Sequence, residues 1–184
     1  MDPQKTVRRC CRVKKEYVRC VAVLTCICLV VAVLLAVTNS FTSPVIAANK
    51  EAAVQASLQE VIPGGSFEPV DLPEGSPETV TAFYRETSGK GYVAVLSTVS
   101  QYSNGDMGIT AAIDSAGAVS AIAITSYFES KDFGRTTYPQ NYYGVTKDTV
   151  GGVDAFAGAT YSSTAFRNAL ADALAVYETV KGGD

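Results

Sequence analysis

MGITAAIDSAGAVSAIAIT, residues 107–125, is the stretch that decides the fold. Its first part, Met107–Asp114, places an apolar residue at every second position, which is the period of a strand with one buried face. Asp114-Ser115-Ala116-Gly117 is typical of a tight turn, and Val119–Thr125 is a second apolar strand. The stretch therefore predicts an antiparallel β-hairpin.

A further strand and a helix are predicted on either side of this hairpin. Tyr92–Val99, YVAVLSTV, is rich in residues that favour strands. Apolar residues recur at helical spacing from about Ser163 to Val180, which predicts a final helix with one buried face. Between the hairpin and the final helix, Tyr127–Tyr143 has no firm period and holds six aromatic residues. We expect an ordered loop with a short helix there.

The region before the hairpin predicts one helix and a connection. Val45–Ile62 has helical spacing, with an expected break over Phe41–Pro44 before it and a stop at Pro63-Gly64-Gly65 after it. The acidic stretch Ser66–Pro77 carries three prolines, and we expect an extended surface connection. No internal repeat is evident.

The first 38 residues predict a membrane anchor. Residues 1–19 hold seven basic and two acidic groups, whereas Val21–Thr38 is uncharged and almost wholly apolar. As a helix, these 18 residues would be about 27 Å long, enough to cross a hydrocarbon core of about 30 Å. The basic block then stays in the cytoplasm, and the acidic remainder of the chain lies outside the cell membrane as a single-pass protein.

Other interpretations of this region explain less of it. A buried core helix needs no adjacent basic block, and the apolar run is longer than that of a cleaved signal peptide. A lipoprotein signal would want a small residue before the cysteine, where Thr25 precedes Cys26. We expect no nucleic-acid partner for the basic block, because its place beside the apolar run is accounted for by topology.

Composition excludes several classes of chemistry. The 184-residue chain has no histidine, which rules out Ser-His-Asp and Cys-His catalysis and every His-ligated metal or haem site. All five cysteines lie within the first 28 residues, so the main domain has no disulfide and no cysteine-held zinc or iron–sulfur cluster. Its carboxylates are scattered, and no acid–base pair stands out.

These observations predict an α+β protein: a single N-terminal transmembrane helix, then a small antiparallel-sheet domain with packed helices. The expected organisation is a cytoplasmic basic N-terminus at 1–19, the transmembrane helix at 20–38, a helix and extended connection at 39–87, and the main domain at 88–184.

The segment Gly151–Thr164, GGVDAFAGATYSST, carries the chemistry. It is a glycine-containing turn that leads into a helix, and the start of a helix favours an anion such as phosphate. The alternative is that Ser162 or Ser163 only caps the helix, as serine often does. The residues alone leave both interpretations open.

Asp154–Thr160, DAFAGAT, resembles the Asp-x-x-(Ser/Thr)-Gly-Ala-Thr motif of covalent FMN-binding domains. In that family a flavin transferase takes FMN from FAD and esterifies its phosphate to the last threonine of the motif. The layout of the chain also resembles the RnfG family of the Rnf electron-transport complex, including Asn39, Thr42 and Pro44 at the exit of the apolar helix. A related flavin-bearing component of the sodium-translocating NADH:quinone reductase shares the motif, and the short spacing between elements here favours the Rnf type.

The resemblance implies a set of cofactor-binding residues. Thr160 would accept FMN through a phosphoester, and Asp154, Gly158 and Ala159 hold the other motif positions, where small residues leave room for a cofactor. Ala157 departs from the family's Ser or Thr. A second family signature, Glu-Thr-Pro-Gly-x-Gly, lines the flavin pocket. Residues 129–134 keep its Glu and last Gly and have Ser130 in place of Thr, but they lack its Pro and first Gly. Its candidate contacts are Glu129, Ser130, Phe133 and Gly134, and Lys131 is a candidate to balance the phosphate charge.

Aromatic residues are concentrated around the same region. Near a sheet such residues are usually core, although one or two of them would suit the rim of a flavin ring. The set is Tyr127, Phe128, Phe133, Tyr138, Tyr142 and Tyr143.

By resemblance, the chain is an electron-transfer component of an ion-translocating ferredoxin:NAD oxidoreductase rather than an enzyme active alone. FMN would be its cofactor, its partners would be the other subunits of the membrane complex, and a flavin transferase would mature it. Two alternatives remain open at this point: a non-redox anchored module for binding or assembly, and a stand-alone anchored flavoprotein for extracellular electron transfer.

Overall fold

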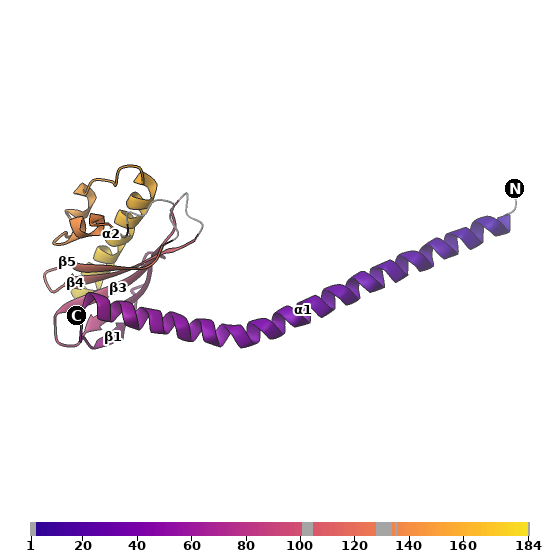
Figure 1. Ribbon diagram of the computed structural model, residues 1–184, viewed down its shortest axis with the longest axis horizontal. Coiled ribbons are helices and arrows are strands. Elements are labelled where there is room, and N and C mark those ends of the chain that lie inside the picture. The colour runs from indigo at the N-terminus through magenta and orange to yellow at the C-terminus, as the bar shows by residue number, and fades with distance from the viewer. Residues whose placement is uncertain (1–2, 101–104, 128–133, 135, 184) are drawn as a thin grey trace. The chain divides into compact units, whose positions relative to one another are not determined.

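The computed structural model describes residues 3–100, 105–127, 134 and 136–183. The chain divides into two compact units, Met1–Lys50 and Glu51–Asp184. The elements, labelled in Figure 1, are α1 (Pro3–Val61), β1 (Phe67–Val70), β2 (Val80–Glu86), β3 (Gly91–Thr98), β4 (Met107–Asp114), β5 (Val119–Ser126), the short 3-10 helices η1 (Tyr138–Tyr142) and η2 (Val150–Gly152), and α2 (Thr160–Gly183).

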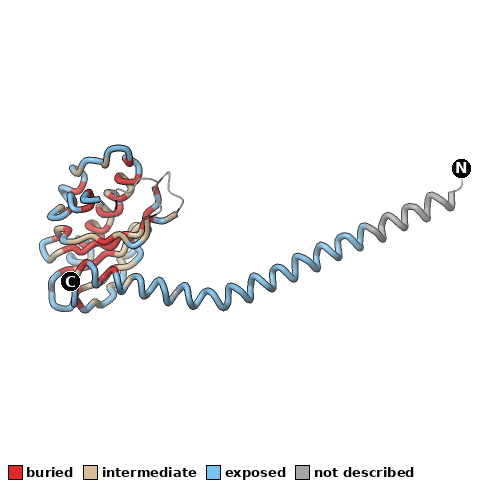
Figure 2. The backbone as a smooth tube through the Cα atoms, viewed as in Figure 1, coloured by how far each residue is buried: buried red, intermediate tan, exposed pale blue. Residues whose placement is uncertain are grey.

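Helix α1 contains the predicted apolar segment. Within the described part of the chain it is the one helix long and apolar enough to cross a membrane, by length and composition, with a mean hydropathy of 3.2 in its most apolar window. Figure 2 shows this part of α1 as exposed along its length. The hydroxyls of Thr25, Thr38, Ser40 and Thr42 each donate to the carbonyl four residues earlier, which satisfies them without water. The side of the membrane on which each end lies stays a prediction.

The expected break at Phe41–Pro44 is wrong, because α1 continues through Pro44 to Val61. A proline within a helix removes one N–H donor and crowds the preceding turn. Membrane-spanning helices tolerate proline because neighbouring groups and local adjustments satisfy the freed backbone atoms, and α1 is helical on both sides of Pro44.

The five strands found in the described residues form one antiparallel sheet in the order β1-β2-β3-β4-β5. The hairpin of β4 and β5 is confirmed, and both strands end within one residue of the predicted limits. Its turn is closed by Asp114, whose Oδ1 accepts the N–H groups of Ala116 and Ala118 at 2.9 Å each. Gly117 has φ +87°, a conformation that favours glycine.

Helix α2 covers one face of the sheet. Its side chains Phe166, Leu170, Leu174 and Tyr177 are fully buried. They share one core with alternate residues of β3 and β4, namely Ala94, Leu96, Ile109, Ala111 and Ile113. Figure 2 shows the buried residues concentrated in the sheet and along this helix. Truncating one such aromatic or leucine typically costs about 2–5 kcal/mol.

The end of α1 covers the opposite face. Leu58 and Val61 pack with Val93, Ala112 and Ala123, the residues of β3–β5 that alternate with those facing α2. At this contact the Thr110 hydroxyl donates to the Ser57 hydroxyl at 2.9 Å, both residues being buried. The second unit is therefore a helix–sheet–helix sandwich, which explains why β4 is buried on both faces.

The α+β fold class is confirmed, and the structure adds two strands. β1 lies within the stretch expected to be extended, and β2 follows it. Both belong to the same compact unit as the hairpin and α2. β1 contains Pro69, which an edge strand tolerates because one side of it makes no ladder bonds. Helix α2 is also longer than predicted at both ends.

The turn from β2 to β3 is organised by Glu86. Its carboxylate accepts hydrogen bonds from the Ser88 hydroxyl at 2.6 Å and from the Lys90 N–H at 3.0 Å. The Ser88 hydroxyl, followed by the Lys90 N–H, lowers the pKa of Glu86 below its ordinary value. The turn is consequently held by a charged group.

Candidate functional site

Thr160 is the first residue of α2, and its side chain is exposed. The helix begins here because Ala159 supplies the first acceptor: the Ser163 N–H donates to the Ala159 carbonyl at 2.9 Å. Backbone N–H groups in the first turn of a helix point outward from its end and favour a negative charge. A phosphate esterified to Thr160 would lie at such an end.

The motif residues before Thr160 form a tight turn. The Ala159 N–H donates to the Phe156 carbonyl at 3.0 Å, and Gly158 has φ +82°. A turn closed in this way needs a residue that tolerates positive φ at its third position. A Cβ built on Gly158 would have no atom within 4 Å, so the glycine is required by conformation and faces open space.

Side chains from outside the loop hold it in place. The Tyr138 hydroxyl donates to the Asp154 carbonyl at 2.7 Å, and Nη1 of Arg167 donates to the Val153 carbonyl at 3.2 Å. The Phe156 N–H donates to the Ser163 hydroxyl at 3.1 Å. These contacts fix the loop on both sides of Asp154.

Ser162 and Ser163 do not cap the helix, because both lie inside its first turn. The Ser163 hydroxyl bonds back to the Ala159 carbonyl at 2.9 Å while it accepts the Phe156 N–H. The Ser162 hydroxyl lies 3.5 Å from that of Ser100. The serines thus connect the helix start to neighbouring segments, and the position before the helix is held by alanine.

Two of the aromatic residues are core, as expected for most of them. Tyr138 and Tyr142 are buried and their hydroxyls lie 3.1 Å apart. Burial, followed by the hydrogen bond with Tyr138, raises the pKa of Tyr142 far above its ordinary value, so its phenol stays neutral. Edge-to-face contacts join Tyr138 to Phe156 and Tyr142 to Phe166.

A cleft of about 330 Å³ lies beside the second half of β5. This volume is at the lower end of the range of small-molecule sites. Tyr127 is half-buried and Tyr143 exposed, so these two rings could flank a planar ligand. The lining residues are Glu60, Ile122–Tyr127, Gly134, Thr136, Pro139, Gln140 and Tyr143.

Gly134 allows a close approach within this cleft. A Cβ at this position would lie 2.8 Å from Cδ1 of Ile124 and 2.8 Å from Cε2 of Tyr127. A side chain at this position would therefore force the Ile124 and Tyr127 side chains to move.

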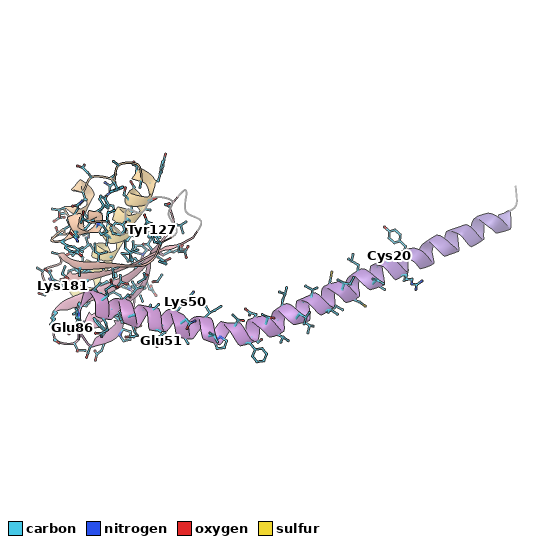
Figure 3. All side chains as sticks on the ribbon, in the orientation of Figure 1. Cys20, Lys50, Glu51, Glu86, Tyr127 and Lys181 are labelled. Carbon is cyan, nitrogen blue, oxygen red and sulfur yellow. The ribbon has the colours of Figure 1, made fainter. Side chains whose placement is uncertain are left out.

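The cleft and Thr160 lie at the same end of the sheet. β3 ends, β4 begins and β5 ends there, since Thr98 pairs with Met107 and Gly108 pairs with Ser126. The Ser162–Ser100 contact places the start of α2 at this end. In Figure 3, Tyr127 marks this end, while Glu86 and Lys181 lie at the other.

Of the four candidate contacts in the second family signature, the structure describes Gly134 alone. Gly134 lines the cleft, whereas Glu129, Ser130 and Phe133 lie outside the described residues, as do Phe128 and Lys131. Among the motif residues, Asp154 and Gly158 are exposed and Ala159 is buried beneath the start of the helix.

Sequence reasoning missed several residues of this site. The apolar period of the final helix gives no reason to single out Arg167, although its position seven residues after Thr160 places both on the same side of the helix. Glu60 and Gln140 reach the cleft from α1 and η1. No local pattern marks these two, because their approach to β5 depends on the tertiary fold.

Comparison with known families gives two matches. Residues 103–175 match the FMN-binding domain, and residues 14–61 match the RnfG N-terminal region. Together the matches cover more than half of the chain, and the first includes Thr160 and most of the cleft. The comparison with curated proteins gave no match.

Proposed function

Since the chain belongs to the RnfG family of the Rnf complex, we propose that it carries FMN covalently on Thr160 as a membrane-anchored electron-transfer subunit. The complex it serves is an ion-translocating ferredoxin:NAD oxidoreductase. One observation carries the proposal: inside the matched FMN-binding domain, Thr160 is exposed at a helix start, next to a loop held by three hydrogen bonds.

The attachment step transfers FMN from FAD to the threonine hydroxyl. A bond forms between Thr160 Oγ and the FMN phosphorus, the phosphoanhydride bond of FAD breaks, and AMP leaves. The hydroxyl proton passes to solvent through the transferase. The resulting phosphodiester keeps one negative charge, which the N-terminus of α2 stabilises.

The residues around Thr160 and along the cleft fit a covalently attached FMN. Thr160 is accessible to a modifying enzyme, and Gly158 leaves the adjacent face of the turn open. The ring system would be held in the cleft beside β5, whose lining includes the apolar Ile122 and Ile124 and the aromatic Tyr127 and Tyr143. Bound there, FMN supplies the redox chemistry, while the protein holds it and excludes water from part of its surface.

In this proposal the anchor tethers the FMN domain to the membrane that holds its partner subunits. Helix α1 is long and apolar enough to span a membrane, and the RnfG N-terminal match covers the apolar segment. The basic residues before it remain cytoplasmic and the FMN domain faces the other side. Other Rnf subunits are the partners, and a flavin transferase matures the chain.

The test is in-gel flavin fluorescence after denaturing electrophoresis. Wild type, Thr160→Ala and Thr164→Ala are each co-expressed with a flavin transferase and exported. Thr164 lies one helical turn after Thr160 and is half-buried, so its variant is a matched threonine-to-alanine control. We expect fluorescence in wild type and Thr164→Ala and none in Thr160→Ala.

Fluorescence that persists in Thr160→Ala would assign the attachment to another residue. Absence of fluorescence in wild type, with the transferase active on a control domain, would overturn the covalent proposal. Co-purification of the loaded chain with integral membrane subunits then distinguishes a member of a complex from a stand-alone flavoprotein.

A further inference from the structure

Arg167 brings a positive charge to the loop before Thr160. Its Nη1 donates to the Val153 carbonyl at 3.2 Å, next to the Asp154 carbonyl that Tyr138 holds. A guanidinium offers five donors in a planar arrangement that suits the oxygens of a phosphate. Of the side chains that hold this loop, it is the one suited to balance an anion.

Arg167 and Thr160 lie on the same side of α2. Seven residues are almost two full turns of an α-helix, so the two side chains project in nearly the same direction. Long side chains on a helix lean toward its N-terminus. The bond to the Val153 carbonyl shows that the guanidinium is directed toward the loop that leads into α2.

The geometry points to Arg167 as a positioning residue for FMN attachment at Thr160. It fixes Val153 and, through it, the loop that presents the acceptor hydroxyl. Its charge then stabilises the phosphodiester that remains after AMP leaves. This inference rests on the proposed function and adds the cation that the site needs.

The experiment measures the rate of FMN incorporation into the full-length chain in detergent, with FAD and a purified flavin transferase. Arg167→Met removes the charge and keeps most of the apolar stem, and Arg167→Lys keeps the charge but loses the planar donors. Lys181→Met is the matched control, because it removes one positive charge from the same helix at the opposite end of the sheet. Thermal unfolding of each unmodified protein monitors folding.

We expect Arg167→Met to load about tenfold more slowly than wild type, as for loss of a charge-assisted hydrogen bond. Arg167→Lys should load at an intermediate rate, and Lys181→Met at the wild-type rate. The deficit of Arg167→Met should shrink between about 0.02 M and about 0.5 M salt, because screening weakens the advantage of the charge. A purely structural role would leave the deficit unchanged by salt.

Wild-type loading of Arg167→Met would overturn the inference. So would a salt-independent deficit, or equal deficits in the Lys and Met variants. If Arg167→Met unfolds, Arg167→Lys decides the question through its own rate and salt dependence. Failure of the proposed function itself is seen separately, since wild type would then not load at all.

Discussion

Replacement of Gly158 by alanine tests whether the attachment turn depends on left-handed backbone. Gly158 has φ +82°, and nothing lies within 4 Å of the added Cβ, so the substitution perturbs conformation without a steric clash in the folded chain. Gly152 is a matched control. Its added Cβ also has no neighbour within 4 Å, and its φ lies outside the left-handed region.

The expected magnitude follows from two opposing terms. Left-handed backbone costs an L-residue about 1–2 kcal/mol, whereas replacing glycine stiffens the unfolded chain and contributes about 0.4–1 kcal/mol of stability. Gly158→Ala should therefore lose about 0.5–1 kcal/mol, and Gly152→Ala should gain about 0.5 kcal/mol. Asparagine tolerates this backbone better than alanine does, so Gly158→Asn should be intermediate.

The assay combines thermal unfolding with FMN loading. A difference of about 1–1.5 kcal/mol between the two alanine variants corresponds to about 3–6 °C in the unfolding midpoint of a domain of this size. Loading of Gly158→Ala should also be slower, because the turn between Phe156 and Ala159 sets the direction in which Thr160 projects. Equal midpoints and equal loading in Gly158→Ala and Gly152→Ala would refute the argument that this glycine is required by its backbone angle.

Three further predictions concern the cleft, the helix contact and the β2–β3 turn. Gly134→Ala should displace the Tyr127 ring and weaken FMN retention in Thr160→Ala protein, measured by equilibrium dialysis; unchanged retention would exclude this cleft. Ser57→Ala should cost about 1 kcal/mol in thermal unfolding, whereas adding Thr110→Val should recover part of it, since a lone buried hydroxyl costs more than an absent pair. A larger loss in the double variant would contradict this. Because the folded-state pKa of Glu86 is lowered, its contribution is present above the unfolded value and lost as pH falls through the folded value. The stability advantage of wild type over Glu86→Gln should therefore disappear on acidification, and an advantage that grows would reverse the assigned sign.

The parts of the fold that the sequence predicts are those with local causes. The β4–β5 hairpin follows from alternation and a turn whose Asp114 closes it locally. Helix α2 follows from its apolar period. By contrast β1 is four residues long and includes Pro69, so its pairing with β2 depends on the sheet already present beside it. Local pattern could not place such a strand.

The same distinction applies to the site. The motif pointed to Thr160 without reference to tertiary structure, and Gly158 follows from the turn. Arg167 and Tyr138 approach the loop from 14 and 16 residues away in sequence. Glu60 is still farther in sequence from the other residues that line the cleft. It belongs to the end of α1, which packs on the face of the sheet opposite α2. These contacts arise only when the helices and sheet have packed.

The two edges of the sheet are protected by different means, and this bears on the cofactor. β1 is short and carries Pro69, both of which discourage pairing with another chain. β5 has eight residues and is largely apolar; in the described part of the chain its start is covered, where Val119 exchanges hydrogen bonds with Gly144 and Val145. The second half of β5 instead lines the cleft. A flavin ring bound in the cleft would cover the edge of this second half of β5. If FMN is attached to Thr160 as proposed, the covalent bond would keep that cover in place as well as retain the redox group.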